Sequence, residues 1–241
     1  MTTILHLDAS ARVTRSLSRH LSQRFVETWR AHRRDDRVIR RDLAADPPPH
    51  VSEAWIAACF TPPQQRDAAM RAALAWSDAA IAELEQADVI VIGTPMYNYG
   101  MPSALKAWFD QVIRVGRTFS FDLARGDRPI EPLMRGKMLV VLSARGEFGF
   151  APGGLRAAQN HLDPHLATCT PYIGVAEEAI HTVAIEFQEF GDERHARSRS
   201  DADARVLALA VELARLQPDV ATELQAAVTS SSVAPASSAA V

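Results

Sequence analysis

The sequence contains little cysteine and no long apolar run. Its two cysteines, Cys59 and Cys169, are far apart and form neither a CxxC pair nor a metal-ligand spacing, so a disulfide framework is not expected and a reducing compartment is indicated. No apolar run approaches the length of a membrane span. The start, MTTILHLDASARVTRS, is too short and too polar after Leu7 for a secretory signal. We therefore expect a cytoplasmic protein without a membrane partner.

The sequence also lacks a large excess of charge of either sign. Its 26 Lys and Arg residues nearly balance 29 Asp and Glu residues, for a formal net charge of -3. This gives no reason to expect nucleic acid or an anionic membrane surface as a partner. With 47% apolar and 23% charged residues, the composition is that of an ordinary globular protein. A chain of 241 residues is long enough for one large domain with a packed core.

Hydrophobic periodicity predicts strands that alternate with helices. The expected strands are residues 3–8, 37–43, 87–93, 137–143 and 179–187; the expected helices are 16–31, 65–86, 102–115, 155–167 and 199–217. Proline clusters bracket residues 46–65, an excursion with a short helix expected over 52–59. The pattern predicts an α/β fold: a doubly wound, five-stranded parallel sheet between two helical layers. The domain is expected to span residues 1–217, and residues 218–241 to form a disordered tail.

Two common nucleotide-binding motifs are absent after the first strand. Neither G-x-G-x-x-G nor G-x-x-x-x-G-K-[ST] occurs there, which argues against a dinucleotide fingerprint and a P-loop. The loop DASARVTRSLSRH instead supplies Ser10, Ser16 and Ser18 just before and within the start of a helix. Backbone N–H groups at a helix start attract a phosphate, and serine hydroxyls add donors. The alternative is that these serines only cap the helix.

Two further loops follow buried strands. In GTPMYNYGMPSALKAWFD, residues 93–110, the strand ends and Tyr97-Asn98-Tyr99 precede a helix that starts near Pro102. These residues offer flat surfaces and amides to a planar polar ring, or simply anchor an ordinary loop. The loop SARGEFG, residues 143–149, either lets a ligand approach its backbone or forms a plain turn. Because ligands of doubly wound sheets bind where strand order reverses, the three loops together would form a flavin mononucleotide site of the flavodoxin-like kind.

The segment PMYNYGMPSALKAWFDQVIRVGRTFSF, residues 95–121, resembles the hallmark segment of a known enzyme family. The family is that of the FMN-dependent NADH-azoreductases, also called NAD(P)H:quinone oxidoreductases, which have the flavodoxin-like fold. The serine loop and SARGE after the fourth strand extend the resemblance, which covers roughly residues 3–216.

The resemblance implies a homodimer with one FMN per subunit, near the subunit interface. NADH or NADPH would reduce the flavin, and a quinone or azo compound would reoxidise it from the same pocket in a ping-pong reaction. The resemblance also implies the site residues. Ser10, Ser16, Leu17 and Ser18 would hold the phosphate; Pro95, Met96, Tyr97, Asn98 and Tyr99 would line the isoalloxazine; Ser143, Ala144, Arg145, Gly146 and Glu147 would face its other side. Phe119 and Phe121 would lie near the acceptor, or else pack in the core.

Some residues depart from the family pattern. Tyr99 replaces a usual Phe, and Ala144-Arg145-Gly146-Glu147 replaces a usual Ser-Arg-Gly-Gly. A carboxylate at Glu147 beside the flavin would disfavour the anionic reduced ring, so Glu147→Gly is expected to raise the midpoint potential. The alternative is that Glu147 points to solvent or pairs with Arg145 and leaves the flavin unaffected. The residues suggest no acid-base catalyst, and no metal is expected: His161 and His165 have helical spacing but no convincing carboxylate beside them. Two other functions stay open, a flavodoxin-type electron carrier and a flavin-free dimeric binding protein.

Overall fold

A computed structural model describes residues 1–216, and its centre is a five-stranded sheet in which every neighbouring pair is parallel. The strand order is β2-β1-β3-β6-β7. The strands are β1 (Thr3–Asp8), β2 (Arg37–Asp42), β3 (Val89–Pro95), β6 (Lys137–Ala144) and β7 (Val175–Ile185). The predicted doubly wound α/β fold is therefore confirmed. The chain places β2 on one side of β1 and β3 on the other, so the order reverses at the carboxyl ends of β1 and β3.

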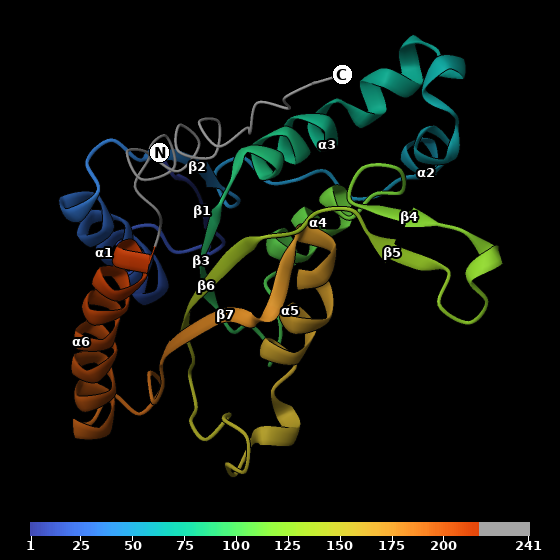
Figure 1. Cartoon of the computed structure of the whole chain (residues 1–241). Coiled ribbons are helices and arrows are strands. Elements are labelled where there is room, and N and C mark those ends of the chain that lie inside the picture. The colour runs from blue at the N-terminus through green and yellow to red at the C-terminus, as the bar shows by residue number, and fades with distance from the viewer. Residues whose placement is uncertain (217–241) are drawn as a thin grey trace, which may run out of the picture.

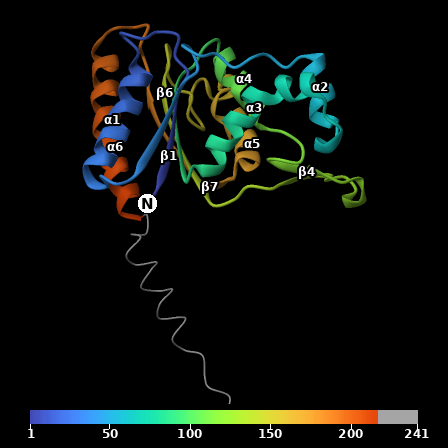
Figure 2. The ribbon, with the colours of Figure 1, turned by 90° about the horizontal axis from the view of Figure 1, so that it is seen from above.

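Helices cover both faces of the sheet (Figures 1 and 2). On one face lie α1 (Leu17–His32) and α6 (Glu193–Leu216), which contact each other. On the other lie α3 (Ala68–Gln86), α4 (Ser103–Val112) and α5 (Asp163–Cys169). The buried strand β3 shows why two layers are needed: Val89 and Val91 join the core beneath α1 and α6, whereas Ile90 and Ile92 join the core beneath α3 and α4. No helix among residues 1–216 is long and apolar enough to cross a membrane.

Two elements extend beyond the sheet on the side of α3 (Figures 1 and 2). The excursion forms α2 (Glu53–Phe60), which packs on α3, and a 3₁₀ turn, η1 (Pro63–Gln65). An antiparallel hairpin follows α4, built from β4 (Phe119–Phe121) and β5 (Ile130–Pro132) around a 3₁₀ turn, η2 (Leu123–Arg125). This hairpin was not predicted from the sequence. Its strands are three residues each, too short for a periodic pattern to show.

The helix predicted over residues 155–167 is largely wrong. Only the 3₁₀ turn η3 (Ala157–Gln159) forms in its first part, and α5 begins at Asp163. The Asn160 side-chain oxygen accepts hydrogen bonds from the N–H groups of Leu162 and Asp163, and Pro164 occupies the first turn, where its missing N–H is harmless. A last 3₁₀ turn, η4 (Thr170–Ile173), follows α5.

The last strand and the last helix both begin earlier in the structure than the sequence predicted. Strand β7 starts at Val175 and not at 179: its first residues include exposed Glu177 and Glu178, which give no apolar pattern, and its register against β6 shifts between Lys137 and Leu139. Helix α6 starts at Glu193, six residues before the predicted boundary of 199, with a polar first turn that carries no apolar periodicity. The predicted tail, residues 218–241, lies outside the described residues.

Candidate functional site

The candidate site lies at the carboxyl ends of the central strands. Four loops meet there: the loops that follow β1, β3 and β6, and the loop that joins β7 to α6. The first contains the predicted phosphate serines, the second the Tyr97-Asn98-Tyr99 segment, and the third the residues after Ser143. They surround a cavity of about 630 Å³, a volume within the range of small-molecule sites, about 300–1,000 Å³.

The serine loop presents hydroxyl groups and a helix start to this cavity. Ser16 caps α1: its Oγ accepts the N–H of Arg19 at 3.3 Å, and lies 3.3 Å from the Oγ of Ser18. The Oγ of Ser10 accepts the N–H of Arg12 at 3.2 Å. Because a hydroxyl both accepts and donates, the bonds that Ser10 and Ser16 accept do not use their own O–H groups, although one of the Ser16 and Ser18 hydroxyls donates to the other. The first amides of a helix have no partner within the helix. The cap and the phosphate site, posed as alternatives by the sequence, are therefore compatible.

The segment after β3 folds back in a tight turn. Tyr97 and Gly100 exchange two backbone hydrogen bonds of 3.0 and 3.1 Å. The two residues between them, Asn98 and Tyr99, both have positive φ, at 46° and 68°. This is the geometry of a type I′ turn, which Asn tolerates well and Tyr poorly. Strain of this kind persists where the surrounding structure imposes it, and it concentrates at binding sites.

The loop after β6 is joined to the loop after β7 by three backbone hydrogen bonds. The N–H groups of Phe187, Gln188 and Glu189 donate to the carbonyls of Glu147, Arg145 and Gly146, at 3.1, 3.2 and 3.0 Å. The Glu189 side chain lies over Gly146: a Cβ there would lie 2.6 Å from its Oε1, so the Glu189 side chain would have to move. Gln188 and Glu189 are thereby placed against the cavity.

Most of the predicted flavin-binding residues line this cavity. They are Ser10, Ser16, Leu17, Ser18, Pro95, Met96, Tyr97, Asn98, Ala144 and Gly146. Four residues that the sequence analysis did not name also line it: Arg12, Arg15, Gln188 and Glu189. The two arginines lie within the serine loop, so their positive charge was available as a signal. Gln188 and Glu189 reach the cavity through the loop pairing, which no local motif reveals.

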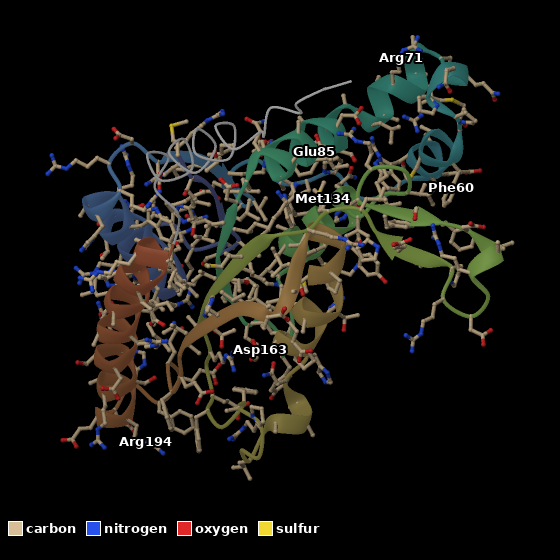
Figure 3. The ribbon with its side chains drawn as sticks, viewed as in Figure 1. Phe60, Arg71, Glu85, Met134, Asp163 and Arg194 are labelled. Carbon is tan, nitrogen blue, oxygen red and sulfur yellow. The ribbon has the colours of Figure 1, made fainter. Side chains whose placement is uncertain are left out.

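The other four predicted residues have their side chains engaged elsewhere. Ser143 is buried, and its Oγ accepts the Nε of Arg145 at 3.3 Å. The Arg145 guanidinium donates to both carboxylate oxygens of Asp163, at 2.9 and 2.8 Å; Asp163 is labelled near the foot of α5 in Figure 3. Glu147 pairs with Arg156 at 2.7 Å and accepts the hydroxyl of Tyr99 at 3.0 Å. This hydrogen bond raises the pKa of Tyr99 above its ordinary value.

Phe119 and Phe121 lie on β4, away from the residues that line the cavity. Phe119 is half-buried against Tyr172, with ring centroids 6.0 Å apart, and Phe121 is exposed. Among residues 1–216, no group of three or more His, Cys, Asp or Glu side chains is arranged to hold a metal ion. His161 precedes α5, so it is not the helical neighbour of His165 that its spacing suggested.

Comparison with known proteins connects this geometry to a family. A family model described as "Flavodoxin-like fold" matches residues 2–209. The FMN-dependent NADH:quinone oxidoreductase 2 of Idiomarina loihiensis is 46% identical over 220 residues, which is 88% of this chain and 91% of the relative. The chain belongs to the FMN-dependent NADH:quinone oxidoreductase family. The FMN-dependent NAD(P)H:quinone oxidoreductase 1 of Pseudomonas aeruginosa is 45% identical, over 87% of this chain and 99% of that relative.

Solved structures of this family type show the same fold at lower identity. The crystal structure of an FMN-dependent NADH-azoreductase from Bacillus anthracis, in complex with FMN, aligns with a TM-score of 0.77 at 18% identity, covering 89% of this chain and 100% of the other. Another azoreductase from B. anthracis aligns with the same TM-score at 22% identity, over 87% of this chain and 99% of the other. These two likenesses support the flavodoxin-like fold, as the five-stranded topology does.

Proposed function

We propose that this protein is an FMN-dependent oxidoreductase that passes two electrons from NADH or NADPH to a quinone or an azo compound. The family membership gives the reaction class. The observation that carries the proposal is the cavity itself, where the hydroxyl-rich start of α1 faces the strained turn after β3.

The serine-loop side of the cavity suits a phosphate monoester. The hydroxyls of Ser10, Ser16 and Ser18 and the N-terminal amides of α1 supply donors. Arg12 and Arg15, which line the same cavity, supply positive charge. A single terminal phosphate fits this arrangement, so we propose FMN and not FAD as the bound cofactor.

The opposite side suits a planar ring. Met96, Tyr97 and Asn98 after β3 line the cavity together with Ala144, the last residue of β6, and Gly146 in the loop that follows; the N–H of Met96 donates to the carbonyl of Ala144 at 2.9 Å. Gly146 has no side chain of its own, and the Glu189 side chain lies against it at the edge of the same cavity. Bound FMN would supply the redox chemistry, hydride acceptance from a nicotinamide and two-electron reduction of the acceptor. The protein's residues bind the flavin, orient it and exclude water; no side chain is proposed as an acid-base catalyst.

The flavin content and redox response of the purified protein test this proposal. We expect a yellow protein that bleaches with NADH or NADPH and regains its colour with a quinone, and whose heat-released cofactor is FMN by chromatography. Release of FAD would contradict the phosphate assignment. A yellow protein inert to both nucleotides would be an electron carrier, and a colourless protein that FMN does not restore would be a flavin-free binding protein. Steady-state rates with both nucleotides against quinones and azo dyes would then rank donors and acceptors.

We also propose a homodimer, on different grounds from those the sequence offered. The aromatic-rich run 108–121 is more apolar than one helix needs for its own core contact, which would favour an interface, but its Trp108 and Phe109 are buried in the core. Exposed apolar side chains lie instead on the excursion and the hairpin: Val51, Ile56, Phe60, Phe121, Leu123, Ile130 and Leu133. Phe60, labelled on α2 in Figure 3, is 71% exposed. Scattered exposed apolar residues are common, but this concentration on two projecting elements favours an interface. The acceptor role of Phe119 and Phe121 and the cytoplasmic location remain predictions.

A further inference from the structure

Arg19, in the first turn of α1, holds the serine loop from outside the cavity. Its Nε and Nη2 both donate to the carbonyl oxygen of Ser10, at 3.2 and 2.7 Å. Its backbone N–H donates to the Oγ of Ser16. One residue therefore contacts both ends of the loop whose hydroxyls face the cavity. The Arg19 side chain is only 13% exposed, so these contacts are shielded from water.

The Arg19 guanidinium is itself fixed by Asp42, at the end of β2. Nη1 and Nη2 donate to the two carboxylate oxygens at 2.6 and 2.7 Å, a bidentate pair. Asp42 also accepts the N–H groups of Ala44 and Ala45 at 3.0 and 3.2 Å, so the carboxylate cannot follow the arginine if the loop moves. The hydrogen bond from Arg19 lowers the pKa of Asp42 below its ordinary value, so the pair stays ionised at neutral pH.

Arg19 lies behind the serine loop and not in the cavity. It does not line the candidate flavin cavity, but it lines a neighbouring hollow of about 510 Å³ beside His6, Asp8 and Asp42. Ser16 borders both hollows. Any effect of the Asp42–Arg19 pair on a phosphate must therefore pass through the position of the loop or act through space as charge.

We propose that the Asp42–Arg19 pair is a positioning device that shapes the serine loop for a phosphate and so makes the site selective for phosphorylated flavin. The inference rests on the proposed FMN site. It assigns Arg19 and Asp42 a role in cofactor selection, in addition to their contribution to packing. Neither residue is expected to touch the flavin.

The variant Asp42→Asn separates positioning from simple charge. Through space, removing a negative charge near the loop makes the site more favourable to phosphate, so FMN would bind more tightly. If the pair positions the loop, FMN binds more weakly, on the order of tenfold, the lower end of the loss seen when a residue that orients metal ligands is removed. The two explanations therefore predict opposite signs for one measurement.

The experiment measures dissociation constants of the apoprotein for FMN and for riboflavin, by quenching of flavin fluorescence. Riboflavin has the same ring and ribityl chain but no phosphate, so its affinity should not change in Asp42→Asn. The matched control is Glu83→Gln, which breaks the bidentate pair between Arg41 and Glu83 (2.8 and 2.7 Å) on the adjacent residue of β2, away from the serine loop. The control should leave both dissociation constants unchanged.

The possible results test the phosphate site and the positioning role of Asp42 and Arg19 separately. If the wild-type protein does not prefer FMN to riboflavin, the phosphate site and the proposed function both fail. If it does, and Asp42→Asn retains or increases that preference, the positioning role alone is overturned. An equal loss for both flavins in Asp42→Asn would also overturn it, since it indicates general damage. If Asp42→Asn does not fold, Arg19→Lys serves as the second variant. It keeps the positive charge but removes the forked guanidinium, and it must show the same selective loss of FMN affinity.

Discussion

Ser16 has two proposed functions, and a second serine in the chain allows them to be measured separately. Its Oγ caps α1 at 3.3 Å from the N–H of Arg19, and its hydroxyl faces the candidate phosphate site. Ser52 caps α2 with the same geometry, accepting the N–H of Trp55 at 3.2 Å, but does not line the cavity. Alanine at either position should reduce the free energy of unfolding by about 0.5–2 kcal/mol, the usual effect of losing a serine cap.

Only Ser16→Ala should also weaken FMN binding. A hydrogen bond to a charged group contributes about 1.5–3 kcal/mol, so the dissociation constant should rise by roughly ten- to a hundredfold. Urea unfolding of the apoprotein gives the stability change, and fluorescence quenching by FMN gives the affinity. Equal stability loss with an affinity loss confined to Ser16→Ala would support both functions. If FMN affinity fell equally in both variants, or in neither, Ser16 would be no more than a helix cap.

Three further results are expected. Because Glu147 does not line the cavity and its carboxylate lies at Arg156, Glu147→Gly should raise the FMN midpoint potential by less than about 15 mV, or about 0.7 kcal/mol for a two-electron couple. A rise of several tens of millivolts in a spectroelectrochemical titration would instead indicate direct repulsion between Glu147 and the reduced flavin. Burial alone would raise the pKa of Asp36, but hydrogen bonds from the Thr2 backbone N–H and the side chains of Trp29 and Arg33 lower it below the ordinary value. The ionised Asp36 therefore stabilises the fold above the unfolded carboxyl pKa of 3.8, and this stabilisation should be lost as the pH falls through the lower pKa of the folded state. Asp36→Asn should make the free energy of unfolding, measured by urea titration, depend less on pH in this acid range. Phe60→Asp should shift the oligomer towards monomer in sedimentation velocity, and an unchanged distribution would exclude α2 from the interface.

The sequence predicted the fold well where one element carries a strong local pattern. The run 87–93 has apolar side chains at both odd and even positions, and the structure buries both faces of β3. The helices α1 and α4 begin within a residue of the predicted start, because serine caps one and Pro102 precedes the other. Prediction failed where long-range pairing determines the structure. The early start of β7 depends on a register shift against β6, and the β4–β5 hairpin depends on pairing of two three-residue strands.

The candidate site shows the same division between local and long-range determinants. Residues on the first three loops were recognisable because each follows a buried strand and lies within a short motif. Gln188 and Glu189 were not recognisable, since they reach the cavity only by pairing with Arg145 and Gly146, more than forty residues earlier. That pairing also explains the side chain of Arg145: its backbone is occupied by the neighbouring loop, and its guanidinium extends to Asp163.

The positive φ values at Asn98 and Tyr99 connect the loop geometry to binding. A type I′ turn at this place presents Tyr97 and Asn98 to the cavity while the hydroxyl of Tyr99 reaches Glu147 on the opposite loop. A glycine at 99 would relieve the strain but remove that contact, so the turn would keep its shape with one fewer connection to the loop after β6. Tyr99 therefore adopts a strained backbone conformation and at the same time links the loop after β3 to the loop after β6, both of which border the proposed ring site.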